Sequence, residues 1–310
     1  MMEMIENGLL ISVFAACLRI ATPLILSAMG ELITQRAGIW NLGIEGTMLT
    51  AAFVAYIVMI ATGSLALATL AGISAGAAVG LLTAFMTASL RLNHFVTGLA
   101  VNLVANGLTL FMFRSLAGAS AAPGIKGFES IPLHPLSDIP FLGPVLFDQR
   151  GLTYAAYLLV PLVWLFLYKT RYGLELRALG ENPKALEARG LSVVPRLYVA
   201  TVTGSALSGL AGAFLVLGLS DRFIADISGG RGWLVVVALV AGNWNVWGTV
   251  FAVVVFAFLD AIASHAQVLA LPVPYQVFLV LPYLASIVLL AVVRSRSAQP
   301  AQLGISIKHP

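Results

Sequence analysis

Long apolar runs dominate this sequence, and they restrict its possible folds more than any other feature. Several of them approach or exceed the roughly 20 residues that a helix needs to cross a bilayer. They occupy residues 9–29, 47–63, 65–90, 94–113, 152–168, 197–219, 249–267 and 275–293, with a shorter run at 232–242. Only 10% of the residues are charged, against roughly 25% in soluble proteins. The sequence therefore predicts an all-α, polytopic transmembrane helix bundle of about nine spans (eight to ten), forming a single domain over 1–310.

The basic residues between the runs predict an orientation. When the runs cross the membrane alternately, most of the 17 Lys and Arg residues fall on one side, and such residues accumulate on the cytoplasmic face. The N-terminus and the loop 115–150 are then outside, whereas residues 169–196 and the tail 294–310 are cytoplasmic. The pI of about 9.4 is explained by these loops beside membrane lipid, without a nucleic-acid partner. The single cysteine, Cys17, excludes an internal disulfide.

Residues 169–196 form the largest charged island in the chain, and its centre predicts a short helix. Asn182 suits the N-cap, Pro183 the first helical position and Gly190 the end. The helix would have about seven residues, or two turns, which is too short to be stable alone in water. We therefore expect a second protein to bind here and to drive the membrane domain through this loop. The residues expected to take part are Arg177, Gly180, Glu181, Asn182, Pro183, Lys184, Glu187 and Gly190.

The stretch 30–48 is too polar to cross lipid and too apolar to be a free loop. Irregular backbone at membrane depth is tolerated only when it is buried in protein or lines a cavity. Its two acids, Glu31 and Glu45, lie near the expected inner boundary, where pairing with Arg36 would satisfy either one; a proton-relay role is the alternative.

The run 94–113 carries polar residues on one helical face. His94, Gly98, Asn102 and Asn106 are spaced four apart. Amides inside a membrane are costly unless they are paired or in contact with water. Two interpretations remain open, hydrogen bonds between helices or a face that lines the solute path. The candidate path residues are Asn41, Glu45, His94, Asn102, Asn106 and Asn243.

Two further patterns concern the architecture. Small residues recur at every fourth position in 64–88 and in 200–212, which predicts close helix packing in preference to a ligand site. The stretches GIWNLGIEGT (38–47) and GNWNVWGT (242–249) are alike. Internal duplication of interrupted segments is a transporter feature, and a chance match is the alternative.

The sequence holds no catalytic or cofactor motif. Its four histidines have no metal-ligand spacing, and no nucleophile elbow or intramembrane pair of Asp residues is present. No lysine lies in a GxxxxGK[ST] loop, so the chain has no phosphate cradle for ATP. We expect a protein that is not an enzyme and has no metal site; if ATP powers it, another subunit binds the nucleotide.

Several stretches together resemble a known family. They are GELITQRAGIWNLGIEGTMLTAAF (30–53), NHFVTGLAVNLVANGLTLFMFR (93–114), TRYGLELRALGENPKALEARGLSV (170–193), SGGRGWLVVVALVAGNWNVWG (228–248) and LPYLASIVLLAV (281–292). In this order they look like the membrane permease of bacterial ABC importers for branched-chain amino acids, ribose and nucleosides. The greatest likeness is to the simple-sugar and nucleoside branch.

This resemblance implies a permease of the bacterial cytoplasmic (inner) membrane that moves a nucleoside or simple sugar inward by alternating access. In the family, the segment here numbered 180–190 is the coupling loop that docks on the ATP-binding subunit. The implied partners are that subunit, a second permease, identical or different, and a periplasmic or lipoprotein substrate-binding protein. The alternative is an ion- or proton-coupled secondary transporter of a small polar solute.

Overall fold

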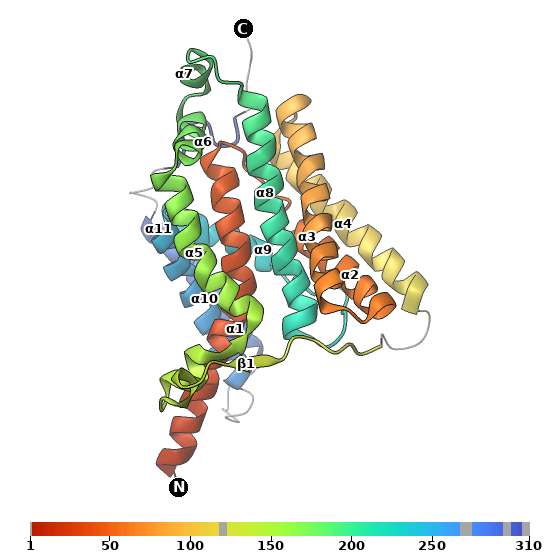
Figure 1. Cartoon of the computed structure of the whole chain (residues 1–310), viewed down its shortest axis with the longest axis vertical. Coiled ribbons are helices and arrows are strands. Elements are labelled where there is room, and N and C mark those ends of the chain that lie inside the picture. The colour runs from red at the N-terminus through yellow and green to blue at the C-terminus, as the bar shows by residue number, and fades with distance from the viewer. Residues whose placement is uncertain (1, 118–122, 267–274, 294–298, 306–310) are drawn as a thin grey trace.

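The computed structural model describes residues 2–117, 123–266, 275–293 and 299–305 as a bundle of long helices (Figure 1). Within these residues, seven helices are long and apolar enough to span a membrane. They are Leu10–Arg36, Ile44–Thr62, Leu65–Ser89, His94–Leu116, Gly151–Lys169, Val193–Leu219 and Val246–His265. Two shorter apolar helices, Arg231–Ala241 and Val280–Leu289, accompany them. The predicted polytopic helical bundle is confirmed.

The α-helices in chain order are α1 (Met2–Arg36), α2 (Ile44–Thr62), α3 (Leu65–Ala84), α4 (His94–Ala117), α5 (Gly151–Lys169), α6 (Arg171–Glu181), α7 (Pro183–Glu187), α8 (Val193–Phe214), α9 (Arg231–Ala241), α10 (Val246–Ala266) and α11 (Tyr275–Val293). Short π-helical turns extend two of them, η1 (Phe85–Ser89) after α3 and η4 (Leu215–Leu219) after α8. The start of α1 and the helix α7 lie at opposite ends of the bundle (Figure 1).

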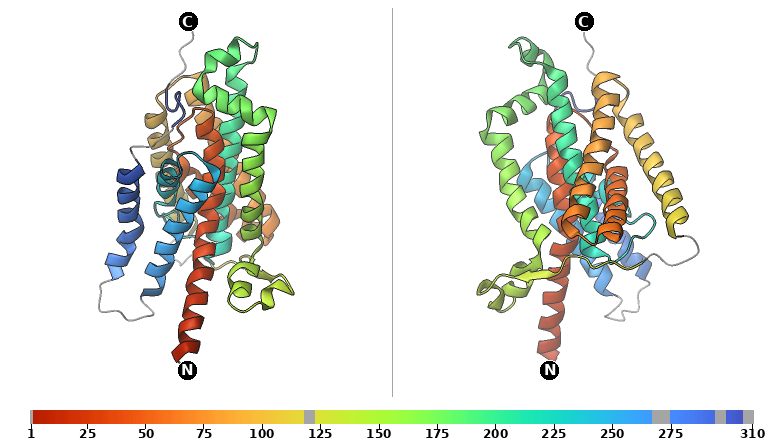
Figure 2. Two further views of the ribbon diagram at one scale, coloured as in Figure 1. Left: turned by 90° about the vertical axis from the view of Figure 1, so that its left-hand side faces the viewer. Right: turned by 45° about the vertical axis from the view of Figure 1, so that its right-hand side comes forward.

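Helix α1 runs through the centre of the bundle and is longer than the sequence predicted (Figure 2). It continues past residue 29 to Arg36, so the irregular segment covers only 37–43. The reason is packing against α8: a Cβ atom on Gly30 would meet the backbone of Gly204. The buried hydroxyls of Ser27 and Ser208 are 2.9 Å apart and hydrogen-bonded. The polar residues of this stretch therefore pack against other helices, and α1 remains helical as far as Arg36.

The small residues of α3 and α8 allow close contact between helices, as the sequence predicted. A Cβ on Gly76 of α3 would meet the backbone of Gly209 in α8, and one on Gly80 would meet Ser205. On another side of α8, Gly212 lies against the backbone of Met48 in α2. Helix α8 thus packs directly on α2 and α3, in the manner of small-residue interfaces in membranes.

The loop between α4 and α5 carries a two-stranded antiparallel hairpin. Strands β1 (Ser130–Pro132) and β2 (Asp148–Arg150) pair with Ser130 opposite Arg150. Between them lie the short helical turns η2 (Leu136–Asp138) and η3 (Gly143–Phe147). This hairpin lies at the same end of the bundle as the first turns of α1 (Figure 2).

Helix α9 begins inside the bundle. After η4 the chain is non-helical through 220–230. Phe223 in this segment is 1% exposed, with its ring centroid 5.3 Å from that of Phe53 and 5.1 Å from that of Phe113. Burial of this aromatic ring keeps the segment inside the protein. Helix α9 then lies at mid-height behind α1 and α8 (Figure 1).

Candidate functional sites

The charged island folds into two helices joined at a sharp corner. The sequence predicted the second, α7, which begins at Pro183 after Asn182; Gly190 beyond its end has a φ of 72°. It ends at Glu187, two residues earlier than expected, and the Asn182 side chain makes no capping hydrogen bond. The first helix, α6, was not predicted from the sequence. Thr170 caps its N-terminus by accepting a 3.1 Å hydrogen bond from the Gly173 N–H.

The island residues divide into an exposed and a packed set. The exposed ones, Glu181, Asn182, Lys184, Glu187 and Gly190, form what we call the coupling surface. Pro183 and Gly180 are buried. Arg177 is half-buried; it donates to the Leu167 carbonyl at 3.0 Å, and its guanidinium lies 4.9 Å from the Tyr168 ring centroid. Five of the eight predicted residues are therefore accessible to a partner, and Arg177 fixes α6 to the end of α5.

The coupling surface rests directly on the end of α1. A Cβ on Gly180 would meet the Arg36 carbonyl, so only glycine allows this approach. The C-terminal residues Pro300–Gly304, here called the tail strap, complete the contact. The Gln302 N–H donates to the Gly180 carbonyl at 2.8 Å, and the Gly304 N–H donates to the Gly38 carbonyl at 3.1 Å.

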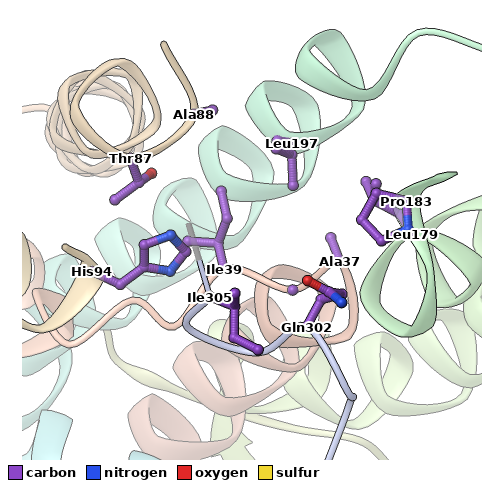
Figure 3. A pocket seen from close by; sticks show the side chains of 11 residues that line it. Ala37, Ile39, Thr87, Ala88, His94, Leu179, Pro183, Leu197, Gln302 and Ile305 are labelled. Atoms are coloured by element: carbon purple, nitrogen blue, oxygen red, sulfur yellow. The ribbon is translucent and has the colours of Figure 1, made fainter. Parts of the chain in front are cut away.

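A small pocket marks this junction (Figure 3). Leu179 and Pro183 lie on one side of it and His94 and Thr87 on the other, with Gln302 between them (Figure 3). Leu303 of the tail strap is 6% exposed and belongs to the main apolar core. The coupling surface, the tail strap and the segment 37–43 are therefore packed as one unit.

Three predicted path residues hold the segment 37–43 in place. His94 Nδ1 accepts a hydrogen bond from the Trp40 N–H at 3.1 Å. Asn102 donates to the Leu42 carbonyl at 2.9 Å and accepts from the Gly46 N–H at 2.8 Å. Asn41 accepts from the Gly43 N–H at 3.0 Å. These polar groups are used within the protein, and those of His94 and Asn102 join α4 to residues 40–46.

Glu31 and Glu45 do not pair with Arg36, which corrects the sequence expectation. Glu31 is fully buried and accepts from Gln35 at 3.2 Å and from Asn41 at 3.2 Å. Arg36 instead donates to the Trp244 carbonyl at 2.7 Å and 3.0 Å. The indole of Trp244 donates to Gln35 at 2.7 Å, so a polar network joins the end of α1 to the turn after α9.

Glu45 binds the N-terminus of α9. One carboxylate oxygen accepts from the Gly230 N–H at 2.8 Å and the other from the Gly232 N–H at 2.6 Å. A Cβ on Gly232 would meet the Glu45 backbone, so this approach also requires glycine. The first N–H groups of a helix have no intrahelical acceptor and carry partial positive charge. Glu45 supplies the missing acceptors and the opposite charge.

The two remaining path candidates lie elsewhere. Asn106 is exposed on α4, one turn beyond Asn102. Asn243 lies in the turn between α9 and α10 with a φ of 54°. The structure therefore does not bring the six candidates together in one site.

The two similar Trp-Asn stretches share one local hydrogen bond. Asn245 accepts a hydrogen bond from the Trp247 N–H at 3.0 Å, as Asn41 does from Gly43. Each asparagine precedes a helix, α10 in one case and α2 in the other. The likeness of the sequences thus extends to local hydrogen bonding.

Comparison with known proteins adds to this geometry. Residues 13–293 match the family model described as the permease component of branched-chain amino acid transport systems. The chain belongs to this family. It is a permease component with several membrane-spanning helices, and such components are not enzymes.

Curated relatives of this permease include several transport proteins. The chain is 35% identical to a putative glucose ABC transporter permease protein of Haloferax volcanii over 83% of its length and 78% of the relative's. It is 30% identical to a nucleoside ABC transporter permease protein of Lactococcus lactis, over 92% and 93% of the two chains. It is also 30% identical to a guanosine ABC transporter permease protein of Bacillus subtilis, over 94% of each chain. No solved structure was found to match it.

Proposed function

We propose that this permease is the membrane subunit of an ABC importer that carries a nucleoside or a simple sugar into the cell. The observation that carries the proposal is the likeness, over nearly the whole chain, to nucleoside and guanosine ABC transporter permeases. The glucose permease relative supports simple sugars as the second solute class. Family membership also favours this function over an ion-coupled secondary transporter.

We propose further that a separate ATP-binding subunit docks on the coupling surface. The charged side chains of Glu181 and Lys184 are exposed there, while Gly180 packs without a gap on α1. A displacement of α7 would therefore move the end of α1 and the segment 37–43 with it. Arg177 supports this role by fixing α6 and lies outside the exposed set.

The complete importer would contain a second permease subunit, identical or different, and a periplasmic or lipoprotein substrate-binding protein. We place it in the bacterial cytoplasmic (inner) membrane. Nine crossings are proposed, with the N-terminus outside and the coupling surface and C-terminus in the cytoplasm. They are the seven long helices, α11, and the segment 220–241, in which non-helical residues lead into the 11-residue α9. The basic residues of 169–196 support this orientation.

Reconstituted transport tests the proposal. The permease is co-expressed with candidate ATP-binding and substrate-binding subunits, purified and placed in liposomes. We expect uptake of radiolabelled guanosine or glucose that requires ATP on the side of the coupling surface. Uptake driven by a proton gradient without an ATP-binding subunit would contradict the proposal.

Cysteine cross-linking tests the docking surface separately. Cys17 is buried and Lys184 is exposed. In a Lys184→Cys variant, the introduced cysteine is therefore the accessible thiol among the described residues. We expect this variant to cross-link to the ATP-binding subunit and to react with a membrane-impermeant thiol reagent only from the cytoplasmic side. Reaction from the outside would overturn both the docking site and the orientation.

A further inference from the structure

A group of charged and aromatic residues surrounds the start of α9, deep in the bundle. Arg231 begins α9, Asp260 lies on α10 and Tyr283 on α11. At 1.5 Å per residue, Asp260 is about 21 Å along α10 from Val246, and a bilayer core is about 30 Å thick. By the same measure, Tyr283 is about 12 Å along α11 from its first residue. These side chains therefore lie at membrane depth.

Their contacts join α9, α10 and α11. An Arg231 guanidinium nitrogen and an Asp260 carboxylate oxygen are 4.0 Å apart. The Tyr283 hydroxyl donates to the Gly229 carbonyl at 3.1 Å. Glu45 holds the other side of the α9 N-terminus through Gly230 and Gly232. We call Arg231, Asp260 and Tyr283 the interior polar site.

Hydrogen-bonding capacity at this site is not used up within the described part of the chain. The Arg231 Nε atom is buried without a partner there, and so is the hydroxyl of Ser228, a residue that is 0% exposed. The 4.0 Å separation of Arg231 and Asp260 is too long for a direct hydrogen bond between them. A buried donor without a partner is costly, so a site of this kind is suited to a polar ligand or to water.

The same side chains are partly open. The side chains of Arg231 and Asp260 are 27% and 30% exposed, and Tyr283 is 43% exposed. Ionisable groups at membrane depth do not face lipid; they face the bundle interior or a water-filled cavity. The non-helical approach to α9 leads to the same conclusion, because irregular backbone at this depth is found inside protein or along a cavity. Short or broken helices of this type mark solute sites in transporters.

The chemistry of the site favours a neutral solute that carries hydroxyl groups. Guanidinium groups donate, carboxylates accept, and a phenol does both, so together they match hydroxyls that also do both. The charges of Arg231 and Asp260 are opposite, and that of Glu45 is offset by the positive end of α9. A further charge on the solute would disturb this balance. The 43% exposed ring of Tyr283 offers apolar surface for a flat ring.

We propose that the interior polar site faces a water-filled path and binds the hydroxyl groups of the transported solute as it crosses the permease. This rests on the proposed function, since it locates within the bundle the path for a nucleoside or simple sugar. It assigns the path to the α9–α10–α11 face, whereas four of the six residues expected from the sequence lie around 37–46.

Cysteine accessibility tests whether water reaches the α9–α10–α11 face. Asp260→Cys and Tyr283→Cys are compared with Leu162→Cys, which places the thiol at an apolar, 49% exposed position within α5. The full transporter in membrane vesicles is treated with a charged methanethiosulfonate. We expect both site variants to react at least about ten-fold faster than Leu162→Cys, because a charged reagent avoids lipid. Tyr283→Cys keeps the Arg231–Asp260 pair, so it remains informative if Asp260→Cys does not fold.

Protection and uptake test binding. Guanosine and glucose are added in turn at millimolar concentration, and we expect one of them to slow modification of Tyr283→Cys several-fold. We also expect Asp260→Asn and Tyr283→Phe to raise the KM for uptake of that solute more than they change ATP hydrolysis. If the site variants react only as fast as Leu162→Cys, water does not reach this face and the proposal is overturned. Rapid reaction without protection, together with unchanged KM values, would also overturn it.

The labelling result is independent of the proposed function. If the unsubstituted transporter shows no ATP-driven uptake, the proposed function fails, whereas the reaction rates still show whether the site is open to water. If uptake is normal and the site variants behave like Leu162→Cys, only the location of the path is wrong.

Discussion

At the scale of single residues, two acids of this protein, Glu31 and Glu45, are satisfied by amide side chains and backbone N–H groups. Glu45 accepts two N–H groups of α9, and Glu31 accepts from Gln35 and Asn41. Neither arrangement needs a basic side chain. An acid held in this way can stay at membrane depth and still fix the position of a helix end.

Replacement of Glu45 by alanine tests its structural role. Glu45→Ala leaves the Gly230 and Gly232 N–H groups without their acceptors, which costs about 1–3 kcal/mol of unfolding free energy. Glu45→Gln keeps one acceptor and should lie between alanine and the original. Melting temperature in detergent is the measurement. Glu129→Ala, which removes a side chain that is 75% exposed, is the control. Equal melting of Glu45→Ala and this control would contradict the role.

The residue types were predictable from the sequence, but their partners were not. Glu45 was recognised as an unusual acid, and pairing with Arg36 was the expectation. Glu45 instead accepts hydrogen bonds from backbone N–H groups, and every residue except proline has one, so the sequence does not show which of them bind it. The start of α9 inside the bundle was not predictable for the same reason. The residues SGGRG alone are typical of a polar turn, and only the contacts of Glu45 and the burial of Phe223 place them inside the protein.

At the scale of elements, α6, α7 and the tail strap form a rigid connection to the end of α1. The helix α7 has only five residues, so its position depends on what surrounds it. Buried Pro183 and Leu186 and the hydrogen bonds of the tail strap provide that support. An element of this kind transmits displacement because it has little freedom of its own.

Loss of charge on the coupling surface should separate ATP hydrolysis from uptake. Lys184→Ala and Glu181→Ala each remove one exposed group, and truncation of a central interface residue weakens docking by about 1–2 kcal/mol, or roughly ten-fold. We expect normal membrane insertion, reduced uptake and a lower ratio of solute transported to ATP hydrolysed in reconstituted vesicles. Arg171→Ala, at an exposed position at the start of α6, is the control. Unchanged uptake in both variants would refute the docking site.

Disruption of the tail strap should have a similar effect from the other side of the contact. Leu303→Asp places a carboxylate in the apolar core, where an unpaired charge is not tolerated, and the strap should detach. We expect the transport-to-hydrolysis ratio to fall several-fold while the bundle still inserts. Gln302→Ala is the matched control, because Gln302 binds Gly180 through its backbone N–H. A normal ratio in Leu303→Asp would show that the strap plays no part in coupling.

The sequence predicted α7 from its flanking residues, and the structure bears this out to within two residues. It did not predict α6, because that stretch mixes charges with Leu176 and Leu179, and their burial becomes evident only against α1 and α8. Nor did the sequence predict the tail strap, since backbone hydrogen bonds from a short polar tail leave no pattern in the residues.

At the scale of the whole molecule, close contact among α1, α2, α3 and α8 determines the bundle. Glycine and serine at these contacts let backbones approach, and apolar side chains fill the remaining space. The stripes of small residues made this packing predictable from the sequence. Which stripe meets which helix was not predictable, because spacing alone does not name the partner.

Addition of one methyl group tests this packing. Gly76→Ala on α3 would bring a Cβ atom within 2.6 Å of the Gly209 Cα, so α3 and α8 must separate. We expect the free energy of unfolding to fall by about 1–3 kcal/mol, as for other overpacked sites. Gly107→Ala on α4 is the control, since nothing lies within 4 Å of its added methyl group. Thermal melting in detergent compares them, and equal stability would show that α3 and α8 are loosely packed.

The tail strap has a consequence for biosynthesis. Residues 300–304 are made after every helix of the bundle, so Gly180 and Gly38 receive these hydrogen-bond donors only once all the helices exist. A polypeptide whose translation stops early can insert into the membrane, yet it presents an unfinished platform to any cytoplasmic partner. If the coupling surface is the docking site, as we propose, we expect assembly of the complex to wait until residues 300–304 have been made.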